Sequence, residues 1–285
     1  MAQSADSDPF HLPRPRRAPR AVLTRRLALG GAAALLGGAD RVPVAAVPLS
    51  RLDTVWWRNR HQEKLAELRS GRVDLLWLGD SITQDWEKRG PPDWQDFAPV
   101  WQRFYGDRHA VNLGFRGDNT GHLLWRMQNG ELDGIRPKAA VVLVGANNLG
   151  RVHWNAPQTV AGIVAVVDTL HRRTPGTHVL LLGILPSVRS KYVTKTSQAV
   201  NRELAQHFAP GNEAAVGEAG AGRVVFMDLA ALFLRDGQVD RTQFYDDQLD
   251  PPDPPLHPTA QAQARLAEAI EPTLAAMLGD RAKVG

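Results

Sequence analysis

The stretch VDLLWLGDSIT, residues 73–83, decides the fold. It begins with a short, almost continuous apolar run that ends at Gly79. Such a run is typical of a strand covered on both faces, as strands of a parallel sheet are. Asp80 and Ser81 follow at once, so the sequence predicts a tight turn at the carboxyl end of a buried strand.

Four similar apolar runs follow along the chain, at residues 110–114, 139–145, 179–184 and 224–227. Segments with helical length or spacing lie around them, at residues 53–69, 123–127, 160–170, 196–208 and 259–278. Pro272 is expected to kink or end the last of these helices. Strands separated by helices need crossover connections, so the sequence predicts one α/β domain, with a five-stranded parallel sheet and helices on both faces.

Three loops after the predicted strands carry small polar residues, at 79–83, 114–120 and 145–148. The carboxyl ends of parallel strands are where functional groups of such sheets gather. A serine at a strand-to-helix turn exposes its Oγ, and donors from the neighbouring loops can surround an oxyanion. The lipase pattern G-x-S-x-G is absent, because Thr83 stands at its last glycine.

The series GDSIT, NLGFRGDNT, GANN and a late His-Pro-Thr resembles the SGNH (GDSL) hydrolase family, and within it the catalytic subunits of intracellular platelet-activating-factor acetylhydrolase. The resemblance covers roughly residues 74–270. It implies a flavodoxin-like three-layer sandwich and ester hydrolysis through an acyl-enzyme. By motif position it implies that Ser81 is the nucleophile and His257 the base. The backbone N–H groups of Ser81 and Gly117 and the side-chain amide of Asn147 would form the oxyanion hole.

The acidic member of the site is less well defined. The family pattern Asp-x-x-His would place it at position 254, which is proline here. The prediction is that Asp253 orients His257, with Asp250 and Asp247 left open as alternatives. If no carboxylate reaches the imidazole, a Ser–His dyad would remain.

Two further residues are predicted to bind substrate. Arg116 stands where many family members have Ser or Gly, and it is expected to influence the charge of the substrate. Asn148 follows the predicted oxyanion donor. No cofactor or metal is expected, because the chain has no cysteine and no histidine cluster with metal-ligand spacing.

The N-terminal stretch has the composition of an export signal. Seven arginines and three aspartates in residues 1–46 account for the whole net charge of +4, so the rest of the chain carries no basic footprint for nucleic acid or anionic lipid. The pair Arg25-Arg26 precedes the uncharged run Leu27–Ala39, and Val44-Ala45-Ala46 has the small residues that signal peptidase accepts.

These features predict a twin-arginine-type signal peptide over residues 1–46 and a single SGNH hydrolase domain over residues 47–285. The protein is then expected in the periplasm or outside the cell, without a membrane span after cleavage. An uncleaved anchor or a plain basic tail are the other interpretations of this stretch.

The predicted function is an exported serine esterase that removes short acyl groups, acetate above all, from an envelope or extracellular polysaccharide such as cellulose. Exposed tryptophans, of the eight in the chain, would stack on sugar rings. Two alternatives stay open: an acyltransferase acting on the same glycan, and a non-catalytic glycan-binding component of an exopolysaccharide assembly. The oligomeric state is not predicted.

Overall fold

The computed structural model describes residues 42–90, 96–211, 222–249 and 251–283. The chain from Val42 onward forms one compact unit. Most of the predicted signal segment, residues 1–41, lies outside the described residues.

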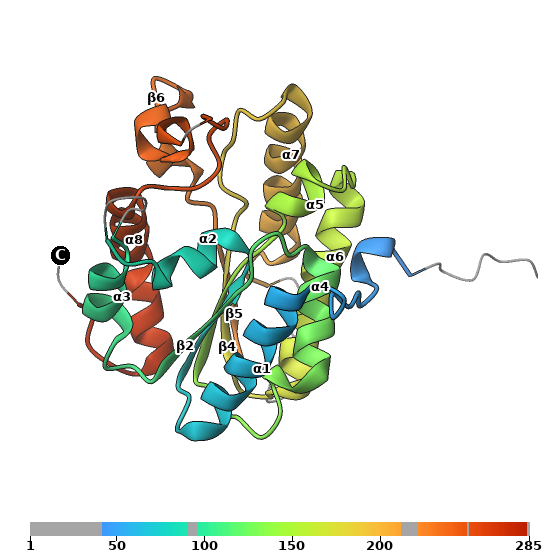
Figure 1. Cartoon of the computed structure of the whole chain (residues 1–285), viewed down its shortest axis with the longest axis vertical. Helices are drawn as coiled ribbons and strands as arrows, with labels where there is room; N and C mark the ends of the chain where they lie inside the picture. The colour runs from blue at the N-terminus through green and yellow to red at the C-terminus, as the bar shows by residue number, and fades with distance from the viewer. Residues whose placement is uncertain (1–41, 91–95, 212–221, 250, 284–285) are drawn as a thin grey trace, which may run out of the picture. The chain divides into compact units, whose positions relative to one another are not determined.

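The described residues contain a five-stranded parallel sheet, as predicted (Figure 1). The strands are β1 Leu75–Gly79, β2 Ala110–Gly114, β3 Ala139–Leu143, β4 His178–Leu182 and β5 Val224–Met227. Their spatial order is β2-β1-β3-β4-β5. The order reverses between β1 and β3, and loops at such a switch point open into a crevice at the carboxyl ends of the strands.

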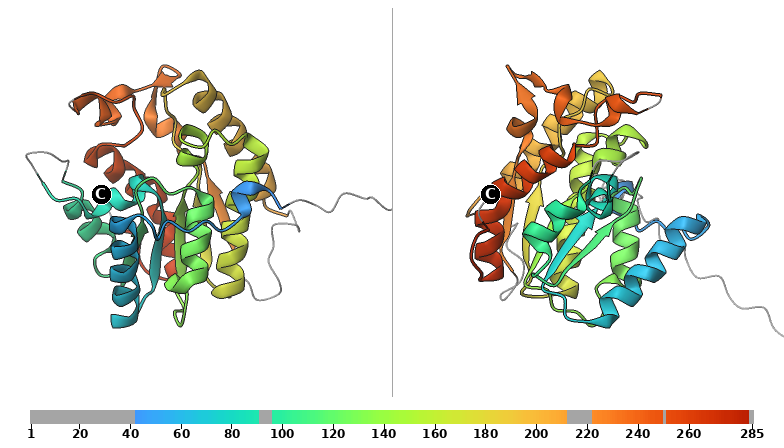
Figure 2. Two further views of the ribbon diagram at one scale, coloured as in Figure 1. Left: turned by 45° about the vertical axis from the view of Figure 1, so that its right-hand side comes forward. Right: turned by 60° about the vertical axis from the view of Figure 1, so that its left-hand side comes forward.

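Helices cover both faces of this sheet (Figure 2). One face packs against α1 Val55–Ser70, α4 Thr120–Arg126, α6 Ala156–Arg173 and α7 Lys191–His207. The other packs against α3 Ala98–Tyr105 and α8 Ala260–Leu278. Together with the sheet they form the three-layer sandwich that the resemblance implies.

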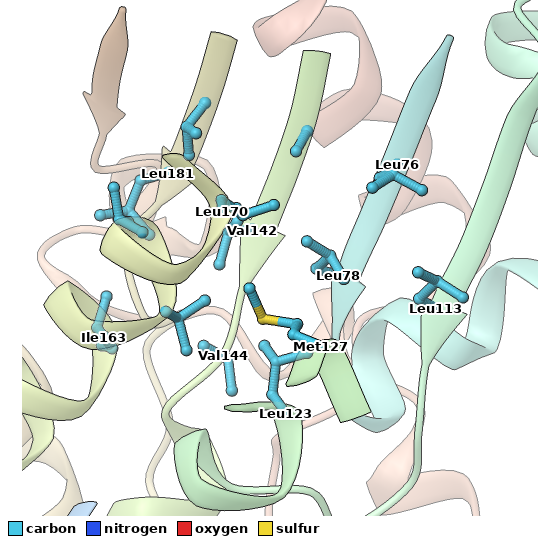
Figure 3. Close-up of a cluster of buried hydrophobic side chains, with 14 of the residues drawn as sticks. Leu76, Leu78, Leu113, Leu123, Met127, Val142, Val144, Ile163, Leu170 and Leu181 are labelled. Atoms are coloured by element: carbon cyan, nitrogen blue, oxygen red, sulfur yellow. The ribbon is translucent and has the colours of Figure 1, made fainter. Parts of the chain in front are cut away.

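Alternate residues of β1 enter the two cores. Leu76 and Leu78 face the helices α4 and α6, where Met127 packs against them (Figure 3). Leu75 and Trp77 face α3 and α8. All four are fully buried. Burial on both faces explains why the strand is apolar throughout instead of alternating with polar residues.

The structure differs from the sequence prediction at two helices. Helix α8 continues through Pro272 to Leu278, although a proline removes one backbone donor. Its residues on both sides of the proline, such as Ile270 and Leu274, are buried against the sheet, and this packing outweighs the lost hydrogen bond. Helix α7 begins earlier than expected because the side chain of Ser190 accepts a hydrogen bond from the N–H of Val193 and caps it.

The predicted domain boundary between residues 46 and 47 lies inside the compact unit. Val44–Ala46 forms a 3₁₀ turn, η1, and Ala45 is fully buried. The carbonyl of Ala45 accepts a hydrogen bond of 2.7 Å from Thr120 Oγ1. Gly162 of α6 leaves room for this contact, because a Cβ there would come within 2.6 Å of the same carbonyl. The folded unit therefore includes residues that the sequence pattern assigned to the signal peptide.

None of the helices in the described ranges combines the length and the apolar character that crossing a bilayer requires.

Candidate active site

The carboxyl ends of β1, β2 and β3 carry the predicted site. Helix α2, Ser81–Gln84, starts directly after β1, and α5, Ala146–Gly150, starts after β3 (Figure 1). Gly79 and Gly114 allow α2 to lie against the strand ends. A Cβ at Gly114 would stand 2.1 Å from the backbone N of Gln84, and one at Gly79 would stand 2.2 Å from Thr83 Oγ1.

Asp80 fixes the turn that presents Ser81, as the sequence predicts. It is the N-cap residue of α2, and its Oδ1 accepts a hydrogen bond of 3.0 Å from the N–H of Ile82. Burial raises the pKa of Asp80 to about 7, although the Ile82 N–H and His257 act in the opposite direction. This carboxyl therefore keeps its proton to a much higher pH than an exposed aspartate does.

Ser81 and His257 meet although 176 positions separate them. Ser81 Oγ lies 2.9 Å from His257 Nε2. On the other side of the ring, Nδ1 lies 2.6 Å from Oδ1 of Asp246. A hydroxyl, an imidazole and a carboxylate in this sequence of contacts can pass a proton from the hydroxyl to the ring while the carboxylate stabilises the charged ring.

The predicted acidic partner of His257, Asp253, is not the residue that contacts the imidazole in the structure. Asp246 contacts the imidazole, whereas the side chain of Asp253 is 64% exposed and lies 3.7 Å from Arg189 Nη2. Asp247 is turned away and pairs with Arg241 at 2.5 Å. Asp250, the remaining candidate, lies outside the described residues.

The chain folds this way because the segments before Asp246 and after His257 lie antiparallel. Phe244 and Pro258 form an isolated bridge, and the N–H of Tyr245 donates to the carbonyl of His257 at 3.0 Å. This closure brings a carboxylate eleven residues upstream to the ring. The adjacent residue Asp247 was among the predicted alternatives, but no local signal distinguishes the two aspartates.

Asp246 is held as a carboxylate. Its Oδ2 accepts hydrogen bonds from the N–H groups of Leu256 at 2.7 Å and His257 at 2.5 Å. Burial by itself would raise the pKa of Asp246, but the hydrogen bonds and charge of His257, with these backbone donors, lower it below the usual value. The ring of Tyr245 stacks on the imidazole, with ring centroids 5.6 Å apart, and further restricts its orientation.

The predicted oxyanion donors line one pocket with Ser81 and His257. Gly117 and Asn147 both face this pocket, and Gly117 has a φ of +77°, which glycine adopts without strain. The N–H groups of Ser81 and Gly117 donate no backbone hydrogen bond to the described part of the chain. Asn147 Nδ2 donates to the carbonyl of Asp118 at 3.0 Å and to Asp80 Oδ2 at 3.3 Å. The longer of these contacts is the weaker, and it is the one that an oxyanion could replace.

A buried charge network holds the loop that carries Gly117. Asp118 is fully buried, and its carboxylate accepts hydrogen bonds of 2.9 Å from Arg51, Trp57 and Arg126. Arg126 in turn makes two hydrogen bonds to Glu131. Buried charges that are paired in this way fix a backbone conformation strongly, because breaking one pair leaves another charge uncompensated.

The pocket has a volume of about 330 Å³. Its lining includes Arg116, Arg151, Arg189, Tyr245, Leu249 and Leu256 besides the residues already described. A larger hollow of about 850 Å³ lies beside Trp86 and Trp101 and contains none of the predicted site residues.

Two expectations about substrate binding are not met at this pocket. Asn148 is fully buried and does not line it. Its side chain accepts from the N–H of Thr120 at 3.0 Å and donates to Thr120 Oγ1 at 2.8 Å, so Asn148 joins two loops instead of facing a ligand. No tryptophan of the described ranges lines the pocket, and Trp57, Trp77 and Trp86 are buried. Arg116 does line it, as expected.

Across the described residues, no three His, Asp or Glu side chains are gathered closely enough to hold a metal ion.

The chain is similar in sequence to proteins of known family. The model of the GDSL-like lipase/acylhydrolase family matches residues 77–265. The human platelet-activating factor acetylhydrolase IB subunit alpha1 is 32% identical over 191 residues, which cover 67% of this chain and 74% of the human protein.

Solved structures show the same fold. A GDSL-like lipase from Bacteroides thetaiotaomicron superposes with a TM-score of 0.56 at 14% identity, covering 75% of this chain and 96% of the lipase. A carbohydrate esterase family 3 protein from Talaromyces cellulolyticus superposes with a TM-score of 0.51 at 18% identity, covering 74% and 100%. The fold, the matched family and the human relative agree, and the chain belongs to the GDSL-like lipase/acylhydrolase family of carboxylic ester hydrolases.

Proposed function

We propose that this protein is a serine esterase in which Ser81 is the nucleophile, His257 the general base and Asp246 the residue that orients the base. The observation that carries the proposal is the continuous series of contacts from Ser81 Oγ through both nitrogens of His257 to Asp246, at 2.9 and 2.6 Å. A binding module would not need a hydroxyl, an imidazole and a lowered-pKa carboxylate in this arrangement.

In the proposed reaction, His257 Nε2 takes the proton of Ser81 while Oγ attacks the acyl carbon. The tetrahedral oxyanion accepts hydrogen bonds from the N–H groups of Ser81 and Gly117 and from the amide of Asn147. The imidazolium, stabilised by Asp246, then gives its proton to the leaving alkoxide as the ester bond breaks. Water attacks the acyl-enzyme in the same way, releases the acid and restores Ser81.

The test is hydrolysis of p-nitrophenyl acetate by the purified protein and by Ser81→Ala. Replacing the nucleophile of a serine hydrolase removes at least about 10⁴-fold of its activity. Ser70→Ala, at the exposed end of α1, is the matched control and retains the wild-type rate. Equal rates for wild type and Ser81→Ala would overturn the proposal.

We propose a short acyl group as the part that is removed. A pocket of about 330 Å³ is at the small end of the range for ligand sites, and it must also admit the alcohol side of the ester. In a series of p-nitrophenyl esters, kcat/KM should be highest for acetate or propionate and fall as the chain lengthens beyond butyrate. A maximum at octanoate or longer would contradict this.

We propose an acylated polysaccharide of the envelope or extracellular space as the natural substrate. Two facts support it: the export-type pattern of the N-terminal sequence, and the fold shared with a protein named a carbohydrate esterase. Acetate release from acetylated cellulose and acetylated xylan tests the class, with Ser81→Ala as the blank. Release from neither polymer, with p-nitrophenyl acetate still hydrolysed, would exclude both glycans.

The contact of Asp246 with His257 favours the esterase over the non-catalytic alternative, because a glycan-binding component has no need of an acid that orients the imidazole. The acyltransferase alternative uses the same residues. Its test is to add a cello-oligosaccharide to the p-nitrophenyl acetate assay and to look for the acetylated oligosaccharide as a product.

We propose that the protein is exported, and that its processing point lies before the turn Val44–Ala46. The burial of Ala45 and its hydrogen bond to Thr120 support this position, because a cut after Ala46 would remove a segment that the folded unit encloses. N-terminal sequencing of protein from the periplasm tests both parts. A start at Val47 would contradict the position of the cut, and a full-length cytoplasmic product would contradict export.

A further inference from the structure

Arginines dominate the charge of the pocket. Arg116, Arg151 and Arg189 line it together with two acids, Asp246 and Asp253. Asp246 is committed to the imidazole, and Arg189 lies 3.7 Å from Asp253 and 3.8 Å from Asp246. The charge of Arg189 is therefore offset within the protein.

The charges of Arg116 and Arg151 are not offset in this way. Neither guanidinium forms an ion pair with any residue of the described ranges, although nearly every other arginine near the site does, such as Arg51 and Arg126 with Asp118. Both unpaired side chains are exposed at the pocket. Their positive charge is available to a ligand.

Both arginines flank the predicted oxyanion loop. Arg116 directly precedes Gly117, and its backbone is fixed on both sides: its N–H donates to Gln84 Oε1 at 2.7 Å, and its carbonyl accepts from Arg51 at 3.0 Å. Arg151, just after α5, lies over Gly117, since a Cβ on that glycine would stand 2.6 Å from Arg151 Nη1. The two side chains thus arise from neighbouring loops and line the same pocket.

We infer that Arg116 and Arg151 form a subsite for an anionic group, a carboxylate or a phosphate, carried by the alcohol part of the ester. A planar guanidinium binds either group through two parallel hydrogen bonds. The inference rests on the proposed esterase function and narrows its substrate to acyl esters of acidic compounds, such as a glycan whose acylated residue bears a carboxylate or a phosphate.

The test compares three acetyl esters: 4-acetoxybenzoate, its uncharged methyl ester, and 4-acetoxyphenyl phosphate. They are assayed with the wild type, Arg116→Gln, Arg151→Gln and the double variant. Arg136→Gln is the matched control, because Arg136 is exposed at the opposite, amino-terminal end of β3. For each variant, the ratio of kcat/KM to the wild-type value cancels the intrinsic reactivity of the ester.

The expected result is a fall of about tenfold or more in kcat/KM of the double variant for the better anionic ester, mainly through KM. The methyl ester should change much less, and Arg136→Gln should leave all three ratios near one. The wild-type preference should shrink at high salt, because the arginines are exposed. The anionic ester whose kcat/KM falls more in the double variant shows whether the subsite prefers a carboxylate or a phosphate.

Two results would overturn the inference. One is an equal change for charged and uncharged esters, which would assign the arginines to the oxyanion itself. The other is no response of either anionic ester to the substitutions. Absence of Ser81-dependent hydrolysis for all three esters would instead mean that the esterase proposal has failed.

Discussion

Ser81 and His257 meet at 2.9 Å, yet the segments that carry them are built in opposite ways. Ser81, Gly117 and Asn147 stand on the strand-end loops, which are the short turns after β1, β2 and β3. His257 stands on the base segment, residues 244–258. In the described part of this segment, residues 244–249 and 251–258, the one helical element is the 3₁₀ turn Asp246–Gln248.

The two parts are also stabilised differently. The parallel sheet and buried ion pairs, such as that of Asp118 with Arg126, fix the position of the strand-end loops. The base segment is closed on itself, through the bridge between Phe244 and Pro258, and it is attached to the loop after β4, where Ser187 Oγ donates to the carbonyl of Pro255 at 2.7 Å. The sheet topology therefore positions one half of the site, and a few specific loop contacts position the other.

The largest expected effect is on the base segment. Asp246→Asn should lower kcat by about 10⁴-fold, because an amide cannot hold His257 in the correct tautomer or stabilise its charged form. Asp253→Asn, the matched control in the same segment, should stay within a few-fold of wild type, because Asp253 is exposed and does not reach the ring. Steady-state hydrolysis of p-nitrophenyl acetate measures both. The reverse ranking would return the acid to Asp253.

A smaller effect is expected on the strand-end loops. Asn147→Ala should lower kcat by about 10²–10³-fold with little change in KM, because the amide acts on the oxyanion and not on the bound ester. Thermal unfolding of the variant separates this from damage to the fold, since Asn147 also contacts Asp80 and Asp118. A kcat within threefold of wild type would remove Asn147 from the oxyanion hole.

The smallest effect concerns stability at the turn before Ser81. The folded protein holds the proton of Asp80 up to about pH 7, whereas the unfolded chain releases it near 3.8. Between these values the folded state binds more protons, so this group makes the protein less stable as the pH rises, by at most about 1.4 kcal/mol per pH unit.

Asp80→Asn should remove this dependence. The free energy of unfolding of the variant minus that of wild type should therefore rise by about 1–3 kcal/mol from pH 5 to pH 8. Urea unfolding at several pH values measures the difference, which cancels groups that titrate equally in both proteins. Parallel curves for the two proteins would show that Asp80 is ionised throughout this range.

Much of the strand-end half could be predicted from sequence. Runs such as 75–79 are apolar along their whole length, so they must be covered on both faces, and the polar residues that follow them must gather at one edge. Asn148 shows the limit of this reasoning. It lies at that edge but turns inward to Thr120, and only the packing of α4 against α5 reveals its direction.

Sequence alone determined the five-stranded parallel sheet, because hydrophobic periodicity acts over a few residues and parallel topology then fixes the common edge. The pairing of Ser81 with His257 was implied by the resemblance of short motifs to a known family. The tertiary structure decided which aspartate meets His257, that Ala45 is enclosed by α4 and α6, and that Arg116 and Arg151 line one pocket. These contacts join loops that are distant in sequence, and their geometry depends on the closure of each loop, which no local pattern of residues encodes.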